Sequence, residues 1–168
     1  QQVIDTFGRA AAELGRIDSC FVNAGVSQGF IPFVETDLAE FRRVTSLNLD
    51  AAFVTLREAA KVMLTQGEGG SLVATASLAA QQGVPRGQSY AASKAALIAM
   101  VNSIAVELAK HGIRANSVLP GWVETPMTEG AFAWDRFRER VHPRIPVRRW
   151  GQPSDFESVA VYLASPAS

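Results

Sequence analysis

Apolar residues recur along the chain with two spacings. Three short, mostly apolar runs are typical of buried strands, and we expect them over residues 17–22, 71–76 and 113–119. Longer segments between these runs repeat their apolar residues every three or four positions, as helices do. Strands that alternate with helices in this way predict an α/β fold, with a parallel sheet joined by right-handed crossovers.

The predicted helices carry start and stop signals. Asp37 followed by Glu40 is typical of a capping box, and the helix that it begins is expected to end near Thr65. A second long helix is expected to begin with Ser89 as its cap and to end before Gly112, since glycine adopts the left-handed turn readily. The remaining expectations are a helix from residue 1 to Gly15, short helices and loop over 126–146, and a final helix from Pro153-Ser154-Asp155.

Composition narrows the class of protein. The 168 residues are 48% hydrophobic and 19% charged, which fits one packed domain and excludes wholesale disorder. Lys plus Arg and Asp plus Glu number 16 each, so bulk positive charge for binding nucleic acid is absent. The single cysteine, Cys20, allows neither an internal disulfide nor a thiolate metal site, and we expect no metal. We see no apolar run of membrane-spanning length and therefore expect a cytoplasmic protein with no membrane contact.

Tyr90 and Lys94 form the first candidate for chemistry. They lie four residues apart in a predicted helix, so their side chains share a face. A nearby ammonium favours the phenolate and lowers the pKa of a tyrosine toward neutrality, which would let Tyr90 act as an acid or base. The alternative is an accidental pair on a solvated face. The same spacing does not recur at Tyr162, because the residue four positions after it is Pro166.

Ser77 and Asn48 are further candidates. Ser77 follows the second predicted strand, where its hydroxyl could bind a substrate carbonyl or alkoxide, or simply belong to a turn. A hydrolase nucleophile is not favoured, because no G-x-S-x-G motif surrounds it. Asn48 lies in a helix among apolar residues, where its amide is either an ordinary satisfied group or opens the helix slightly and holds a water.

Each predicted strand ends in a notable motif. The three motifs are Asn23-Ala24-Gly25, Thr75-Ala76-Ser77 and Pro120-Gly121. Ligands of open parallel sheets bind beyond the carboxyl ends of the strands, where these motifs would meet. Taken singly, each glycine motif is also consistent with a plain turn.

In this order and spacing, the motifs resemble the short-chain dehydrogenase/reductase family. Asn48, Ser77, Tyr90 and Lys94 are similar to its catalytic tetrad, and Tyr90-Ala91-Ala92-Ser93-Lys94 matches its YxxxK signature. Asn23-Ala24-Gly25 resembles its strand-four motif, and residues 113–121 resemble its sixth strand and cofactor loop. The resemblance implies a Rossmann-like doubly wound parallel sheet, present here in part as strands four to six. It is nearest to the oxoacyl-carrier reductases and the sugar or polyol dehydrogenases.

The resemblance also implies a reaction. A hydride would pass between NAD or NADP and a small alcohol or carbonyl substrate, interconverting a secondary alcohol and a ketone. Tyr90 would be the general acid or base, Lys94 would lower its pKa and bind the nicotinamide ribose, Ser77 would polarise the carbonyl, and Asn48 would hold a relay water. The implied cofactor-binding residues are Asn23, Ala24, Gly25, Tyr90, Lys94, Pro120, Gly121, Val123 and Thr125.

The sequence departs from the family pattern in two ways. Val22 stands where the family usually has a second asparagine, and the T-G-x-x-x-G-x-G loop that cradles the cofactor pyrophosphate does not occur. We therefore expect a single, truncated domain over residues 1–168, with no residue to select between NAD and NADP. One alternative is a non-catalytic fragment that folds or assembles without turnover. Another is a generic parallel α/β binding domain.

Two further expectations concern surfaces. By family analogy, residues 126–146 would form a mobile substrate lid, with Trp122, Phe132, Trp134 and Phe137 either lining the pocket or packing the lid against the body. The arginines around this segment are interpreted as a solvated face. The helices over 47–64 and 89–110 carry few polar residues, which predicts a homo-oligomer, a dimer or tetramer, through these helices. Alternatively, other parts of the same chain cover them.

Overall fold

A three-stranded parallel sheet forms the centre of the molecule. The computed structural model describes residues 2–168, so the expected helical residue Gln1 lies outside it. The strands are β1 (Ser19–Val22), β2 (Gly70–Thr75) and β3 (Ile113–Val118), in the spatial order β1-β2-β3. Both pairings are parallel, as predicted. β1 starts later than expected because the side chain of Gln66 binds the backbone N–H and carbonyl of Ile17, at 2.7 and 3.0 Å.

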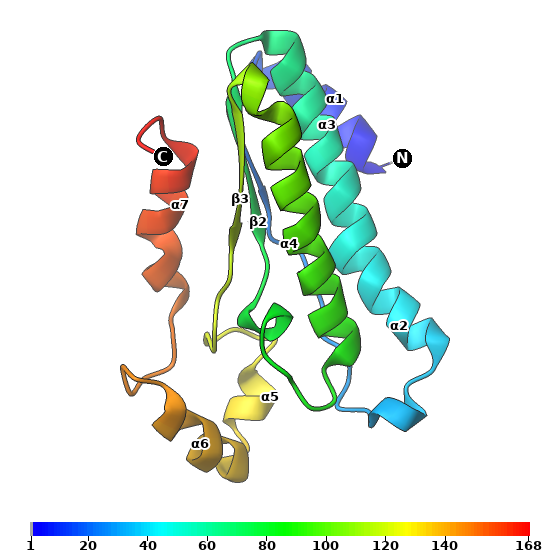
Figure 1. The fold of residues 1–168 in the computed structure, drawn as a ribbon, viewed down its shortest axis with the longest axis vertical. Coiled ribbons are helices and arrows are strands. Elements are labelled where there is room, and N and C mark those ends of the chain that lie inside the picture. Colours follow the sequence, from blue (N-terminus) through cyan, green and yellow to red (C-terminus); the bar gives the residue numbers. More distant parts are fainter. Residues whose placement is uncertain (1) are drawn as a thin grey trace.

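Helices cover both faces of the sheet. α3 (Ala51–Gln66) and α4 (Gln88–Leu108) lie on one face, and α7 (Glu157–Ala164) lies on the other (Figure 1). α1 (Gln2–Leu14) packs against α3. The core between the sheet and the first face is aliphatic; its most buried large members are Leu56, Met63, Leu72, Leu97 and Ile113.

The long predicted helix before β2 is interrupted. α2 (Leu38–Thr45) begins at the expected cap, where the Asp37 carboxylate accepts a hydrogen bond from the backbone N–H of Glu40. A π-helical turn over Ser46–Asp50 then joins α2 to α3. This turn is the local opening of the helix at Asn48 that the sequence left as one of two possibilities.

The start of α4 corrects the sequence prediction. Ser89 is not the cap; the helix begins at Gln88 with Gly87 before it, and Ser89 is fully buried in the first turn. The end of the helix is as predicted, because Gly112 adopts a φ of +68° after a short 3₁₀ turn.

The expectation that no apolar run reaches membrane-spanning length is wrong for α4 and the 3₁₀ turn that follows it. Gln88–His111 spans 24 residues, and its most apolar window has a mean hydropathy of 1.4. That is long and apolar enough to cross a membrane by length and composition alone. The alanine-rich core helix of a soluble protein passes the same test, so the finding is weak evidence for a membrane.

The C-terminal end of α7 is fixed to all three strands. Hydroxyls of Ser19 and Ser71 donate to the carbonyls of Ala164 and Leu163, at 3.3 and 2.6 Å. The guanidinium of Arg114 donates to the carbonyls of Leu163 and Ser165, both at 3.0 Å. A cation at the C-terminal carbonyls of a helix also interacts favourably with the helix dipole. These contacts fix the position of α7 on the sheet.

Short helices lie beyond the carboxyl ends of the strands. α5 (Glu129–Phe132) and α6 (Asp135–Val141) occupy the segment predicted as short helices and loop (Figure 1). An aromatic cluster holds them, with the rings of Phe132 and Trp150 stacked 4.1 Å apart and those of Trp122 and Phe137 4.9 Å apart. Short 3₁₀ turns complete the chain at Phe33–Glu35, Leu78–Ala80, Ala109–His111, His142–Arg144 and Pro153–Phe156.

Candidate active site

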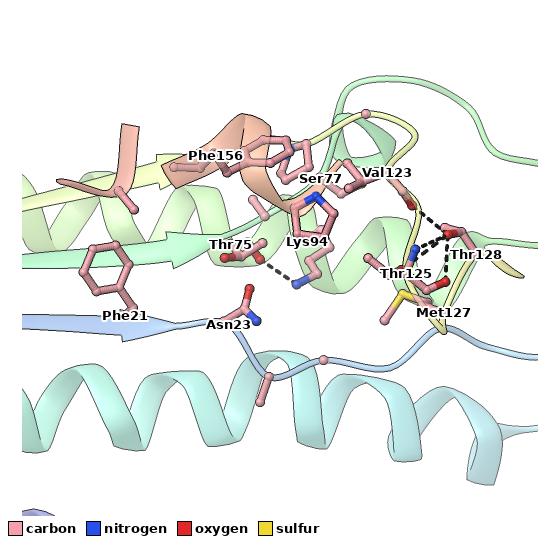
Figure 2. A pocket seen from close by; sticks show the side chains of 18 of the residues that line it. Phe21, Asn23, Thr75, Ser77, Lys94, Val123, Thr125, Met127, Thr128 and Phe156 are labelled. Carbon is pink, nitrogen blue, oxygen red and sulfur yellow. Dashed lines mark hydrogen bonds between the residues drawn. The ribbon is translucent and has the colours of Figure 1, made fainter. Parts of the chain in front are cut away.

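A cavity of about 700 Å³ opens at the carboxyl ends of the three strands. All three strand-end motifs line it, as the parallel topology requires. Ser77, Tyr90 and Lys94 also line it, and Figure 2 shows Lys94 extending across the cavity toward Thr75, near Asn23. Among the described residues that line the cavity, Lys94 is the one with a charged side chain.

Tyr90 is half-buried in the first turn of α4, next to Ser77. Burial raises the pKa of Tyr90 because the phenolate would lose hydration, and a side-chain hydrogen bond with Ser77 lowers the pKa in part. The Ser77 hydroxyl also accepts a hydrogen bond from the backbone N–H of Ala79 at 3.1 Å. The sequence-based expectation was a pKa lowered by Lys94; in this structure burial is the largest influence, and its direction is upward. Tyr90 therefore favours the protonated, proton-donating form here.

Lys94 has only 3% of its surface exposed. Its Nζ donates to the carbonyl oxygen of Thr75 at 2.6 Å and lies 5.7 Å from the centroid of the Tyr90 ring. Burial lowers the pKa of Lys94 to about 8, since the ammonium is poorly hydrated. Sequence reasoning could not identify the Thr75 carbonyl as the partner of Lys94, because any residue can supply a backbone oxygen.

Asn48 lies behind the cavity, outside its lining. Its Oδ1 accepts from the backbone N–H of Val26 at 2.8 Å, and its Nδ2 donates to the Val26 carbonyl at 2.9 Å and to Ser93 Oγ at 3.0 Å. The amide of Asn48 is thus a satisfied buried group, which confirms the first of the two interpretations. The π-helical turn confirms the local opening of the helix, which is one part of the second. Its side chain fixes the loop that follows β1.

Gly25 separates Asn48 from Lys94. A Cβ atom on Gly25 would lie 3.3 Å from Asn48 Oδ1 and 3.4 Å from Lys94 Nζ. Both distances are close for a carbon atom, so glycine lets the loop after β1 approach the two polar groups.

The loop after β3 supplies the opposite wall. Val123 and Thr125 line the cavity together with Pro120 and Gly121. Thr128 Oγ1 donates to the Val123 carbonyl at 2.6 Å and accepts from the Thr125 N–H at 3.1 Å, so its hydroxyl closes the turn.

Of the two alternatives for the aromatic residues after β3, the structure excludes pocket lining. Trp122, Phe132, Trp134 and Phe137 do not line the cavity; Trp122, Phe132 and Phe137 pack together in the aromatic cluster. Trp134 is 55% exposed. The other alternative, in which the aromatic residues pack the lid against the body, fits Phe132 and Phe137, which stack on Trp150. Local sequence did not single out Trp150.

Sequence reasoning missed several lining residues that come from two strands, from the end of the 3₁₀ turn before α7 and from α7 itself. Alternation along the strands could have indicated the strand residues, and the apolar positions around the start of the last helix could have indicated the others. They are Phe21, Val73, Phe156, Val159 and Ala160.

The lining suits a nicotinamide with its ribose. Apolar side chains of Val73, Ala76 and Val118 offer surfaces for a flat ring, and the Lys94 ammonium is a donor for ribose hydroxyls. Gly25 and Gly121 leave the backbone accessible where a larger side chain would fill the space. The donor set fits a nicotinamide cofactor.

A parallel α/β sheet with a serine, a tyrosine and a lysine at its carboxyl edge defines the class of the Rossmann-like oxidoreductases. Residues 1–168 match the family described as Enoyl-(Acyl carrier protein) reductase. The chain belongs to the short-chain dehydrogenase/reductase family.

Named relatives include sugar and sugar-acid dehydrogenases. The chain is 35% identical over 165 residues to an L-rhamnose 1-dehydrogenase (NAD(P)(+)) from Sphingomonas sp. (strain SKA58). This match covers 98% of this chain and 65% of the relative. It is 38% identical over 162 residues to the 2-dehydro-3-deoxy-D-gluconate 5-dehydrogenase of Escherichia coli (strain K12), covering 95% and 63%. The chain thus spans less than two thirds of these relatives.

Solved structures give the same picture. A gluconate 5-dehydrogenase from Burkholderia cenocepacia J2315, in complex with NADP and tartrate, superposes with a TM-score of 0.95 at 28% identity. The match covers 99% of this chain and 65% of that one. The sheet order, the helices on both faces and the parallel pairing are those of the partial Rossmann-like fold that the sequence predicted.

Proposed function

We propose that the protein, in its full-length form, is an NAD(P)-dependent oxidoreductase that interconverts a secondary alcohol and a ketone. The observation that carries this proposal is the convergence of Ser77, Tyr90 and Lys94 on one cavity whose lining suits a nicotinamide. The substrate class is a small polyhydroxylated molecule, by similarity to relatives named as rhamnose and gluconate dehydrogenases. We expect it to act in the cytoplasm.

Tyr90 is the proposed general acid and base. Burial keeps its hydroxyl protonated near neutral pH, so it can donate its proton to a carbonyl oxygen during reduction. Ser77, which lines the same cavity as Tyr90, is proposed to bind the same substrate oxygen and to stabilise the charge that develops on it. In the oxidation direction, Tyr90 takes the hydroxyl proton back.

Lys94 supplies positive charge beneath this pair. Its ammonium favours the phenolate once Tyr90 has given up its proton, and it is available to bind ribose hydroxyls. The nicotinamide, when bound, supplies or accepts the hydride. Asn23, Ala24, Gly25, Pro120, Gly121, Val123 and Thr125 are the proposed remaining contacts to it, and Asn48 is proposed to support a relay water from the π-helical turn.

Two further proposals concern the surface of the protein, and both start from the family resemblance. Residues 126–146 are proposed to form a lid over the substrate, of which Met127 and Thr128 already line the cavity. A second copy of the chain is proposed to contact the helices over 47–64 and 89–110, and in α4 it would contact the outer face. Val106 on that face is 82% exposed, and exposed alanines at Ala92, Ala95 and Ala99 would let another helix approach closely.

Replacing Tyr90 with Phe tests the proposal. The change removes one hydroxyl, so we expect the variant to keep its thermal unfolding midpoint and its affinity for NADPH while losing turnover by about 1000-fold or more. The assay follows NAD(P)H absorbance with D-gluconate, L-rhamnose and acetoin as probes. A Tyr90→Phe variant that turns over at the wild-type rate would contradict the role of Tyr90.

A further inference from the structure

The helix that carries Tyr90 has no cap from its own neighbourhood. Gly87 stands at the cap position, and no adjacent side chain accepts from the first turn. The first N–H groups of a helix have no partner within the helix, so a buried helix start needs an acceptor from elsewhere. Gln28 supplies it: its Oε1 accepts from the backbone N–H of Ser89 at 2.6 Å and from that of Tyr90 at 3.3 Å.

We propose that Gln28 is a positioning residue for Tyr90, fixing the backbone from which the reacting hydroxyl extends. This inference rests on the proposed role of Tyr90 as acid and base. Gln28 is three residues beyond Gly25, in the loop that follows β1 and that also contributes to the cavity wall. One loop would thus place both the wall of the cavity and the tyrosine.

The backbone of Tyr90 is held on its other side as well. Ser93 Oγ donates to the Tyr90 carbonyl at 2.7 Å, and Asn48 Nδ2 donates to Ser93 Oγ at 3.0 Å. Asn48 in turn binds both backbone groups of Val26. Both backbone polar groups of Tyr90 are therefore connected to residues 26–28, directly through Gln28 and indirectly through Asn48 and Ser93.

The other end of the Gln28 amide supports a specific role for its oxygen. Gln28 is 6% exposed, and its Nε2 is buried without a hydrogen-bond partner among the described residues. A buried unpaired donor costs free energy, and an apolar side chain of similar size would avoid that cost. The feature that an apolar residue could not reproduce is the Gln28 oxygen, which accepts from the N–H groups of Ser89 and Tyr90.

A second glutamine provides a matched control. Gln66 also binds the backbone of a distant residue, Ile17, through both ends of its amide. It lies at the end of α3, at the amino edge of the sheet and outside the cavity lining. Loss of either amide removes long-range hydrogen bonds that are at least partly buried, but only the loss of Gln28 should affect Tyr90.

The test uses the full-length protein and the variants Gln28→Met, Gln28→Glu and Gln66→Met. Amide hydrogen exchange at Ser89 and Tyr90 reports the cap directly and needs neither cofactor nor substrate. For Gln28→Met we expect exchange at both amides to quicken by about tenfold or more. We expect kcat to fall roughly tenfold to a hundredfold, because small misplacements of a reacting group are costly, while the Kd for NADPH stays within about twofold.

Gln28→Glu should restore what Gln28→Met loses. Its carboxylate keeps the acceptor and is favoured at a helix N-terminus. Slow exchange should return, kcat should recover at its pH plateau, and the negative charge should shift the Tyr90-dependent limb of the pH profile to higher pH. Gln66→Met should lower stability and leave exchange at Ser89 and Tyr90, and kcat, unchanged.

Each opposite result overturns the inference. Fast exchange at Ser89 and Tyr90 in the wild type would show that the cap is not formed. This measurement does not depend on the variant, so it decides the question even if Gln28→Met fails to fold. Wild-type kcat in a folded Gln28→Met variant, or no recovery in Gln28→Glu, would remove the positioning role and leave the role of Tyr90 intact. Full activity of Tyr90→Phe would instead overturn the proposed function itself.

Discussion

Lys94 gives a quantitative prediction, because its charge is held in a poorly hydrated place. Its side chain is 3% exposed, and burial lowers its pKa from 10.5 to about 8. The perturbation is Lys94→Met, which keeps much of the volume and removes the titrating group. The quantity to compare is the free energy of unfolding of wild type and variant as a function of pH.

The direction follows from proton binding. Between pH 8 and 10.5 the unfolded chain keeps the Lys94 proton that the folded protein has released, so the wild type gains stability relative to the variant as pH rises. Below pH 8 Lys94 is protonated in both the folded and the unfolded state, and burial of its ammonium destabilises the folded protein by the full amount. The complete difference is about 3 kcal/mol, of which roughly 2 kcal/mol should develop between pH 7 and 9.5.

Urea unfolding at half-unit steps of pH measures this difference. Cys20, whose pKa burial raises to about 11, changes stability in the opposite direction at high pH, but it is present in both proteins and cancels in the comparison. A difference that stays flat from pH 7 to 9.5 would refute the reasoning, because it would mean that Lys94 keeps an ordinary pKa in the folded protein.

Three further results are expected. Arg114→Met should lower the free energy of unfolding by roughly 1.5–3 kcal/mol in urea, since charge-assisted bonds to the end of α7 are lost; unchanged stability would mean that they do not hold the helix. Gly25→Ala should reduce kcat severalfold with little change in Tm, since the new Cβ crowds Asn48 and Lys94, and a variant with wild-type kcat would contradict that packing. Light scattering at micromolar concentration should give a dimer or tetramer that Val106→Glu dissociates, whereas a wild-type monomer would exclude the proposed contact.

The fold was readable from the sequence because its signals are local. Apolar runs located the three strands, and the Asp37 cap and the left-handed Gly67 and Gly112 set helix ends within a few residues. The parallel order then brought Ser77 and the other strand-end motifs to one edge without further information.

Long-range contacts between side chains and backbone were not readable. Gln28 takes the capping role that local sequence assigns to Ser89, and it comes from 61 positions earlier in the chain. The direction in which the pKa of Tyr90 shifts depends on burial, which cannot be predicted from the spacing between Tyr90 and Lys94. Phe132 and Phe137 stack on Trp150, and sequence did not indicate this contact for the same reason: a helix pattern predicts which face is apolar but not the partner of that face.

Transfer of deuterium tests the central claim most directly. The full-length protein would be incubated with NADPH deuterated at C4 of the nicotinamide and with a ketone of the polyol class, and the alcohol product would be analysed by mass spectrometry. Direct hydride transfer predicts one deuterium on the carbinol carbon of the product. The Tyr90→Phe variant should form almost none of this labelled alcohol. A product without label, formed at the wild-type rate, would contradict the proposed reaction.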